Sequence, residues 1–358
     1  MIIRSYYTLS PSLRKTWKEF EQSEGSLSPF LHLDYISNIY KQVRLLGIWR
    51  GAFPIFYCVQ SEKGETLLIA PLVKLLLASS YRMLADIRGC GSSDFLYHPK
   101  LTEEERTECL KALFQKLGNK WHLRRLPADS LLKAYLDTHA QTIKTRGCCR
   151  IPITNYETWF GSLSPSVRQN IRTAYNRLKR DNHSFELSIF GKYNFCIKSS
   201  EKELKQAKEE SLDLYIQRQI TKYQNTGFLT TPIKKLAYNF LKHDSKSLYH
   251  NPNSITVILR IDNKIAAYMG CLYSHDQSII IVPRLAIDEQ FRFYSPGYVM
   301  LHEFIKLLST DTQVRILDLS RGVEKYKTDL GGQVYDTFNM KSKWAYWSKI
   351  VHKIGATV

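Results

Sequence analysis

The sequence predicts a mixed α/β protein of the α+β class, built from two domains that meet near residue 150. The chain of 358 residues is long enough for two ordinary domains. Its 44% apolar and 23% charged residues are typical of globular proteins and argue against disorder. Segments rich in β-branched residues alternate with helical patterns, most clearly in the second half. We therefore expect domains at 1–150 and 151–358.

The first 150 residues predict helices and strands in mixed order. The acid run Glu103-Glu104-Glu105 suits the positive end of a helix dipole, so a helix should begin there. Lys63-Gly64-Glu65 separates two strand patterns and predicts a hairpin tip. The expected helices span 13–21, 29–42 and 102–117, and the expected strands span 44–50, 53–60 and 66–76.

The second half predicts a sheet more clearly. Arg150 to Ile153 reads as a short extended segment, and Asp262-Asn263-Lys264 predicts a tight turn between two strands. Pro283 lies inside a third strand pattern, which requires a sheet edge or a bulge. The expected strands span 254–261, 265–273, 278–287 and 315–320, and the expected helices span 165–180, 201–219, 232–243 and 298–308.

The helix expected at 165–180 is the most basic segment of the chain, with five cations and no acid. Ser164 is a plausible N-cap, and Pro165 suits the first helical position. Arg168 and Arg172 lie one turn apart, so both can face one anionic ligand. The alternative is an amphipathic surface helix with a solvated basic face. Its apolar stripe comprises Val167, Ile171, Ala174 and Leu178.

The net charge of +18 comes from 51 Lys+Arg against 33 Asp+Glu. It can steer anionic small substrates such as nucleotides or coenzyme A, bind a polyanion such as tRNA, or hold the protein near acidic lipids. A lysine-rich solvated surface is the alternative. The net charge alone says nothing about the fold.

The apolar segments and the cysteines of the sequence also indicate where in the cell the protein resides. The longest apolar stretch, Leu67 to Ala78, is interrupted by Pro71 and Lys74 and is too short to span a membrane. The first ten residues lack the apolar core of a signal peptide. Seven scattered cysteines, an odd number in a large chain, argue against a disulfide framework. We expect a cytoplasmic protein without a membrane span, although peripheral membrane association stays open.

Residues 292–297 predict an anion-binding helix start. Unpaired N–H groups and the dipole favour negative charge at a helix N-terminus. In the pattern Arg292-x-x-Ser295-x-Gly297, glycine allows close approach of the backbone to phosphates, and Ser295 adds a hydroxyl donor. Pro296 removes one backbone donor. The alternative is a Ser-Pro-Gly turn that caps a buried helix.

A polar cluster follows the last expected strand. Asp318 lies within that strand, and Arg321, Glu324, Tyr326 and Lys327 follow within nine positions. Polar groups at a strand end are a common origin of active sites. A solvated turn with an internal ion pair is the alternative.

These segments together resemble the acetyltransferase (GNAT) fold, in which three antiparallel strands, a bulge, a phosphate loop, a helix and a further strand follow in order. "SPG" about twenty residues before "DLSRGVEKYK", with "KIAA" at 264–267, is similar to the CelD/BcsL-type acetyltransferases of polysaccharide and cell-envelope biosynthesis. These are distant relatives of the Fem peptidyltransferases, which use aminoacyl-tRNA. The resemblance is clear over about 150–345. It is faint earlier, where residues 68–72 and 91–94 echo a first, degenerate half.

The resemblance implies two GNAT-like halves, each a mostly antiparallel sheet flanked by helices, and transfer of an acyl group from acetyl-CoA or another acyl-CoA. The acceptor would be an amine or hydroxyl of a sugar-like molecule. No metal is implied, and the histidines show no H-E-x-x-H spacing. The implied donor-binding residues are Arg292, Ser295, Gly297, Val282 and Arg284.

The same resemblance implies roles in catalysis. Asp318 is the expected base, Glu324 the second choice, and Tyr326 the acid toward the leaving sulfur. An N–H near Val282 would polarise the thioester carbonyl. The expected substrate-binding residues are Arg321, Lys327, Asp94, Arg168 and Arg172.

Two alternatives stay open. The donor can be an aminoacyl-tRNA, which the +18 charge and the basic helix favour, although no long helical-hairpin insertion like that of many Fem proteins is visible. A non-catalytic GNAT-like scaffold is the other, because Ser295 and Pro296 depart from the usual phosphate loop. The aromatic tail at 344–347 is expected to pack in a core rather than stack on bases.

Overall fold

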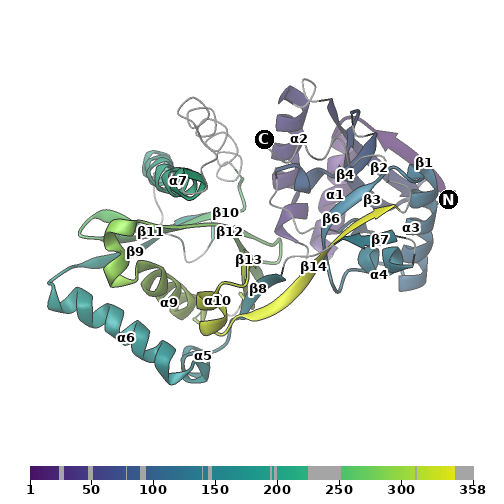
Figure 1. The fold of residues 1–358 in the computed structure, drawn as a ribbon. Helices are drawn as coiled ribbons and strands as arrows, with labels where there is room; N and C mark the ends of the chain where they lie inside the picture. The colour runs from purple at the N-terminus through teal and green to yellow at the C-terminus, as the bar shows by residue number, and fades with distance from the viewer. Residues whose placement is uncertain are drawn as a thin grey trace. The chain divides into compact units, whose positions relative to one another are not determined.

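A computed structural model describes residues 1–23, 28–46, 51–77, 79–88, 94–138, 140–143, 147–193, 196, 200–224, 251–310 and 313–342. Their fold is α+β, with mostly antiparallel sheets flanked by helices, as predicted (Figure 1). Contacts divide the described chain into two compact units, Met1–Gly147 with Tyr335–Val358, and Cys148–Val334. The sequence-based limits differ from these units in placing residues after Val334 in the second domain.

The second unit is built on one sheet. Its order is β9-β10-β11-β12-β13-β8, and every neighbouring pair is antiparallel except β12 and β13, which run parallel. The strands are β8 (Gly147–Pro152), β9 (Phe185–Gly191), β10 (Ser254–Ile261), β11 (Lys264–Tyr273), β12 (Ile279–Ile287) and β13 (Ile316–Arg321).

Helices cover both faces of this sheet (Figure 1). On one face α7 (Glu201–Gln224) packs Ile216 against Tyr268 and Ala286. On the other face α5 (Tyr156–Ser162), α6 (Pro165–Arg180) and α9 (Pro296–Leu308) share the main core with the strands. Alternate residues of a strand face opposite sides, so β11 buries Met269 toward one layer and Tyr268 toward the other.

Several local predictions are confirmed here. The four apolar residues of the α6 stripe are all buried, and the Ser164 hydroxyl accepts a hydrogen bond from Val167 N. Asp262 and Asn263 both have positive φ in the two-residue turn between β10 and β11, as a tight hairpin requires. Pro283 lies at a bulge, because the register passes from Gly270↔Arg284 to Leu272↔Ile281.

The first unit also centres on antiparallel strands. β1 (Ile2–Tyr6), β2 (Ala52–Gln60), β3 (Thr66–Leu75) and β4 (Ser80–Met83) pair in that order, and β5 (Leu96–Tyr97) adds to β3. β14 (Gln333–Ser342) pairs with β6 (His122–Pro127) and with β7 (Ala140–Ile143). The helices are α1 (Pro11–Ser23), α2 (Leu33–Leu46), α3 (Glu103–Leu117) and α4 (Leu131–Asp137).

The two units repeat one strand order. In each unit, four antiparallel strands (β1 to β4, and β9 to β12) are followed by a strand with a parallel contact to the fourth (β6, and β13). That strand then pairs with an antiparallel neighbour (β14, and β8). The parallel contact is a single bridge, Tyr81↔Trp121, between β4 and the start of β6, but three residue pairs between β12 and β13. Each strand after the contact carries a bulge with one positive-φ residue, Arg125 in β6 and Ser320 in β13. The first half is therefore a reduced version of the second.

One sequence prediction is wrong in part. Residues Arg44 to Leu46 belong to helix α2 rather than to a strand at 44–50. The buried stripe of α2 continues to Val43, and the Arg44 guanidinium donates to the Tyr40 hydroxyl one turn earlier, so the helix persists. Positions 47–50, the helix expected at 232–243 and the aromatic tail lie outside the described residues.

Two further boundaries differ from prediction. The helix expected at 29–42 begins as a 3₁₀ turn, Pro29–Leu31, before α2 starts at Leu33. The α9 helix begins at Pro296, two residues before the predicted start, because proline suits a first helical position. Thr102 and Glu105, the last residue of the predicted acid run, form a capping box at the start of α3.

Glu21 in α1 is a buried carboxyl group that the sequence did not single out. It accepts a hydrogen bond from Leu33 N at the start of α2. Burial raises the pKa of Glu21 to about 7, and the Leu33 hydrogen bond only partly opposes this. In the unfolded chain this carboxyl loses its proton near pH 4.5, whereas the folded protein holds it to about pH 7. The free energy of unfolding therefore falls as the pH rises from 4.5 through 7.

We expect Glu21→Gln to stabilise the protein at pH 8 and to change little at pH 4. The amide keeps an acceptor for Leu33 N but removes the charge whose burial costs up to about 3 kcal/mol. Thermal unfolding at both pH values measures this, with exposed Glu19→Gln on the same helix as the control. Equal melting shifts of the Glu21 variant at pH 4 and pH 8 would contradict the prediction.

Candidate functional site

The parallel strands β12 and β13 separate soon after they meet. Their pairing runs from Ile279↔Ile316 to Ile281↔Asp318. Beyond that point β12 continues to Ile287 along β11, whereas β13 bulges along β8. Backbone groups of β12 that follow Ile281 are therefore not paired to β13 among the described residues, so the two strands diverge from that point.

Asp318 stands at the point of separation. Its side chain is buried, with 7% of the residue exposed, and its carboxylate accepts a hydrogen bond from Ser320 N at 2.7 Å. Ser320 has a φ of 57°, a conformation that costs a non-glycine residue about 1–2 kcal/mol. The turn after Asp318 is thus held in an unfavourable shape, and neighbouring contacts must stabilise it.

Lys327 of α10 (Lys325–Asp329) supplies those contacts. Its ammonium donates to the carbonyl oxygens of Leu319 at 2.9 Å, Arg321 at 2.8 Å and Gly322 at 3.2 Å, and lies 3.0 Å from the Glu324 carboxylate. The residue is 4% exposed. An ammonium has three N–H groups, so these carbonyls use its full donor capacity. Substrate binding by Lys327 stays a prediction that would require one of these bonds to break.

Gly322 is required by the same loop. Its φ is 99°, and a Cβ there would meet the Glu324 carboxylate at 2.4 Å. Glu324 itself begins α10, with its side chain mostly exposed. The carboxylate therefore covers Gly322 on one side and faces Lys327 on the other. This places it beside the loop that carries Asp318.

Tyr326 lies half-buried against the main core of the unit. Burial, and then the nearby Glu324 charge, raise the pKa of Tyr326 above its usual range, while Arg218 of α7 opposes this. A phenol that holds its proton so firmly suits hydrogen-bond donation better than full proton transfer to a thiolate. Its expected role as an acid stays a prediction, and donation to the leaving sulfur fits its chemistry.

The loop expected to hold a pyrophosphate is mostly helical. Residues Glu289–Tyr294 form the 3₁₀ helix η4, in which Gln290 N donates to the Asp288 side chain and Phe291 N to Asp288 O. Ser295 N donates to Arg292 O, and Pro296 has no N–H group. Of this stretch, Gly297 N lies in the first turn of α9, where a helix leaves donors unpaired.

The remaining predicted donor-binding residues are spread around this loop. The Arg292 side chain is 81% exposed and lies 3.7 Å from Glu289. Val282 is buried beside the bulge of β12. The Arg284 guanidinium lies 5.1 Å from the ring of Tyr215 in α7, so it packs on the helix layer opposite α9.

Other predicted substrate-binding residues lie elsewhere. The Arg168 guanidinium donates to Gly161 O near the end of α5, and Arg172 is exposed on α6. Asp94 belongs to the first unit, where its carboxylate accepts from Phe95 N at 2.6 Å and Tyr97 Oη at 3.3 Å. Burial raises the pKa of Asp94 to about 6 against these hydrogen bonds.

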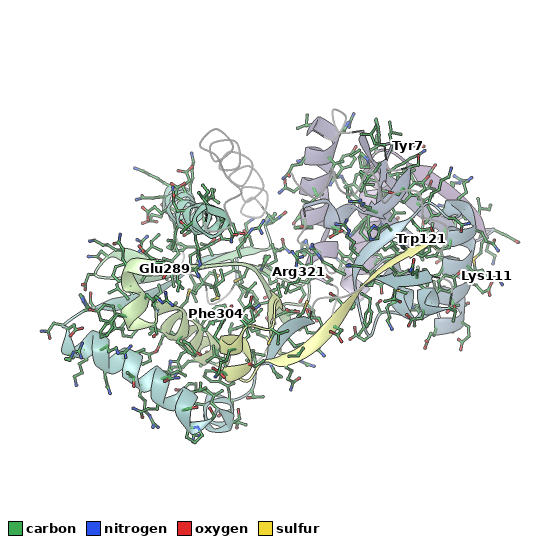
Figure 2. The ribbon with its side chains drawn as sticks, viewed as in Figure 1. Tyr7, Lys111, Trp121, Glu289, Phe304 and Arg321 are labelled. Atoms are coloured by element: carbon green, nitrogen blue, oxygen red, sulfur yellow. The ribbon has the colours of Figure 1, made fainter. Side chains whose placement is uncertain are left out.

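The structure thus brings together the predicted residues of β13 and α10: Asp318, Arg321, Glu324, Tyr326 and Lys327 (Arg321 is labelled in Figure 2). Sequence reasoning missed two neighbours. The Tyr298 hydroxyl donates to Asp329 at 3.3 Å. Tyr298 directly follows the "SPG" motif, and that position is the signal that could have identified it. Arg218 influences Tyr326 from α7, and no local pattern marks it.

Residues 165–328 match the family model described as "Acetyltransferase (GNAT) domain". This segment has the GNAT acyltransferase fold. The match covers β9 to β13, with α6, α7, α9 and α10, and so includes the strand separation and the loop that follows it. Comparison with curated protein sequences gives no match.

Solved structures agree with this fold across the chain. L-PGS from Bacillus licheniformis aligns with a TM-score of 0.55 at 12% identity, over 97% of this chain and 96% of that one. A conserved protein of unknown function from Bacteroides thetaiotaomicron aligns with a TM-score of 0.54 at 12% identity, over 96% of this chain and 100% of that one. FemX aligns with a TM-score of 0.50 at 11% identity, over 98% of this chain and 100% of that one. At such identities the similarity concerns the fold.

None of the helices in the described part of the chain is both long and apolar enough to cross a membrane. Nor do the described histidine, cysteine and acidic side chains form a group of three or more that could hold a metal ion.

We expect Lys327→Met to lower the stability of the second unit by about 3 kcal/mol or more, because one buried and two partly buried carbonyls lose their donor. Thermal unfolding and amide exchange at 319–322 measure the effect. Lys325→Met is the matched control, since that side chain is 86% exposed and pairs with Asp329. Equal stability of the two variants would show that the Lys327 contacts do not hold the loop.

Proposed function

We propose that the protein is a GNAT-type acyltransferase whose donor thioester lies in the opening between β12 and β13. The observation that carries this proposal is the end of their parallel pairing at Ile281↔Asp318, within the segment that has the GNAT fold. A separation at that point gives a thioester access to backbone N–H groups on one side and to a buried carboxylate on the other.

The chemistry is a direct transfer. An acceptor amine or hydroxyl attacks the thioester carbonyl, a C–N or C–O bond forms, and the C–S bond breaks as the thiolate leaves. Val282 N–H is the proposed donor to the carbonyl oxygen, because Pro283 has none. Asp318 takes the acceptor proton, and Tyr326 hydrogen-bonds the leaving sulfur. Glu324 is the second candidate base.

For the acceptor we propose a sugar or glycan precursor in cell-envelope polysaccharide biosynthesis, reached in the cytoplasm. Support comes from the CelD/BcsL-like motifs around Ser295 and Asp318. Arg321 ends β13 with an exposed side chain, so it is the proposed partner of an anionic group on the acceptor. Arg168 and Arg172 stay candidates for the same task on α6.

We expect Asp318→Asn to reduce acyl transfer by about 10²–10⁴-fold, because an amide cannot accept the acceptor proton. The assay follows thiol release from acetyl-CoA with a panel of amino sugars. Asp213→Asn, on the exposed surface of α7, serves as the control. Full turnover by the Asp318 variant would remove that residue as the base and leave Glu324.

A second candidate donor is aminoacyl-tRNA. One observation favours it specifically: the N–H groups of Gln290, Phe291 and Ser295 already have acceptors within the loop, and Pro296 supplies none. A pyrophosphate would therefore find fewer backbone donors here than a phosphate loop normally offers. The net charge of +18 also suits a polyanion.

Titration by calorimetry separates the donors. If acyl-CoA is the donor, acetyl-CoA and desulfo-CoA bind, and Arg292→Ala and Gly297→Val weaken both about tenfold. Arg4→Ala, which removes an exposed arginine on β1 of the first unit, is the control. Salt-sensitive binding of total tRNA without binding of coenzyme A would instead support the aminoacyl-tRNA donor. If acetyl-CoA, desulfo-CoA and tRNA all fail to bind, the result would favour a non-catalytic scaffold.

A further inference from the structure

Three arginines converge in the first unit at the position equivalent to the strand separation of the second. Arg82 follows the bridging residue Tyr81 in β4, and Arg124 and Arg125 occupy the bulge of β6. Arg124 and Arg125 form ion pairs with Asp86 of the 3₁₀ helix Leu84–Arg88, and the charges of Arg124 and Asp86 both act on Arg82. Figure 2 labels Trp121, the residue just before β6.

The bulge explains how two consecutive arginines reach one carboxylate. Leu126 pairs with Phe338 and Leu123 with Met340, so Arg124 and Arg125 lie opposite a single residue of β14, Asn339. Both leucines face the core beneath α3. The Arg124 Nε lies 4.0 Å from Asp86 Oδ2, and the Arg125 Nη1 lies 3.4 Å from Asp86 Oδ1. In a regular strand, adjacent side chains would point to opposite faces.

The cluster has more positive than negative charge. Among the described residues its carboxylate is Asp86, whose side chain is only 2% exposed; it pairs with Arg124 and Arg125, and its charge also acts on Arg82. Arg82 Nε is buried without a hydrogen-bond partner among the described residues. Burial and then the like charge of Arg124 lower the pKa of Arg82, and Asp86 compensates only in part. A purely structural ion-pair network would be expected to balance its charges and satisfy its donors.

We propose that Arg82, Arg124 and Arg125 form a binding site for a phosphate group, either a phosphomonoester or a diphosphate. A dianion would neutralise the two excess charges, and the planar guanidinium matches phosphate oxygens in pairs. The site lies wholly in the first unit and is independent of the donor used by the second. It therefore goes beyond the proposed acyl transfer, and its test does not depend on that activity.

The experiment measures binding of inorganic phosphate, pyrophosphate and glucose 1-phosphate to the full chain by calorimetry at fixed salt. Vesicles of phosphatidylcholine with and without phosphatidic acid test a lipid headgroup as the source. Three variants report on the site. Arg82→Gln removes the guanidinium whose Nε has no hydrogen-bond partner among the described residues, Asp86→Asn removes the competing charge, and Arg4→Gln, exposed on β1, is the charge-matched control.

The proposal requires opposite effects from neighbouring residues. We expect Arg82→Gln to weaken phosphate or pyrophosphate binding about tenfold, Asp86→Asn to tighten it, and Arg4→Gln to leave it unchanged. Tightening by the aspartate variant cannot result from misfolding, so it keeps the test decisive if Arg82→Gln folds poorly. Equal weakening by Arg82→Gln and Arg4→Gln, or no phosphate binding by any form, would overturn the proposal.

Preference among the probes identifies the source. Glucose 1-phosphate or pyrophosphate binding that exceeds vesicle binding assigns the site to a soluble ester. Vesicle binding that needs phosphatidic acid and falls on Arg82→Gln assigns it to a lipid headgroup. Vesicle binding that is insensitive to Arg82→Gln counts against this site as the origin of membrane attraction.

Discussion

The second unit depends on a geometric constraint: β12 and β13 cannot remain paired beyond Ile281 and Asp318. Each strand has its own bulge next to that point, β12 at Pro283 against β11 and β13 at Ser320 against β8. Bulges increase local twist and bend a strand, so the two neighbours diverge in the middle of one sheet. The end of the β12–β13 pairing and the position of Asp318 both follow from that divergence.

The divergence has an energetic consequence at the loop after β13. Ser320 and Gly322 both take positive φ, and the carbonyl groups of this loop turn inward to a common centre. Lys327 fills that centre with its charge. The motif Arg321-Gly322-x-Glu324-x-Tyr326-Lys327 thus describes a folded loop as much as a set of reactive groups. In this arrangement Glu324 faces Lys327, while Asp318 remains fixed by Ser320.

Sequence reasoning succeeded where the signal was local. The buried stripe of α6, the Asp262-Asn263 turn and the bulge at Pro283 each follow from spacing or backbone chemistry of adjacent residues. It failed for Arg44 to Leu46, because α2, which is packed into the core through residues up to Val43, extends into the segment that was predicted as a strand.

The candidate site divides in the same way. The β13 and α10 residues are close in sequence, so their grouping was predictable. Other features were not. They depend on register and strand pairing, which a single sequence does not reveal. Examples are the hydrogen bonds of Lys327 to loop carbonyls, the charge of Arg218 near Tyr326, and the pairing of Arg124 and Arg125 with Asp86.

The first unit takes its strand β14 from residues far along the chain, and this affects how the protein folds. Arg125 N donates to the Asn339 side chain across 214 positions of sequence, and Met340 is fully buried in the core of the first unit. During synthesis, the N-terminal residues emerge long before this strand does. The edge of β6 must therefore wait, unpaired, until nearly all of the intervening residues have been translated. Such a delay exposes a sheet edge to wrong partners and slows folding, because contacts so distant in sequence form late.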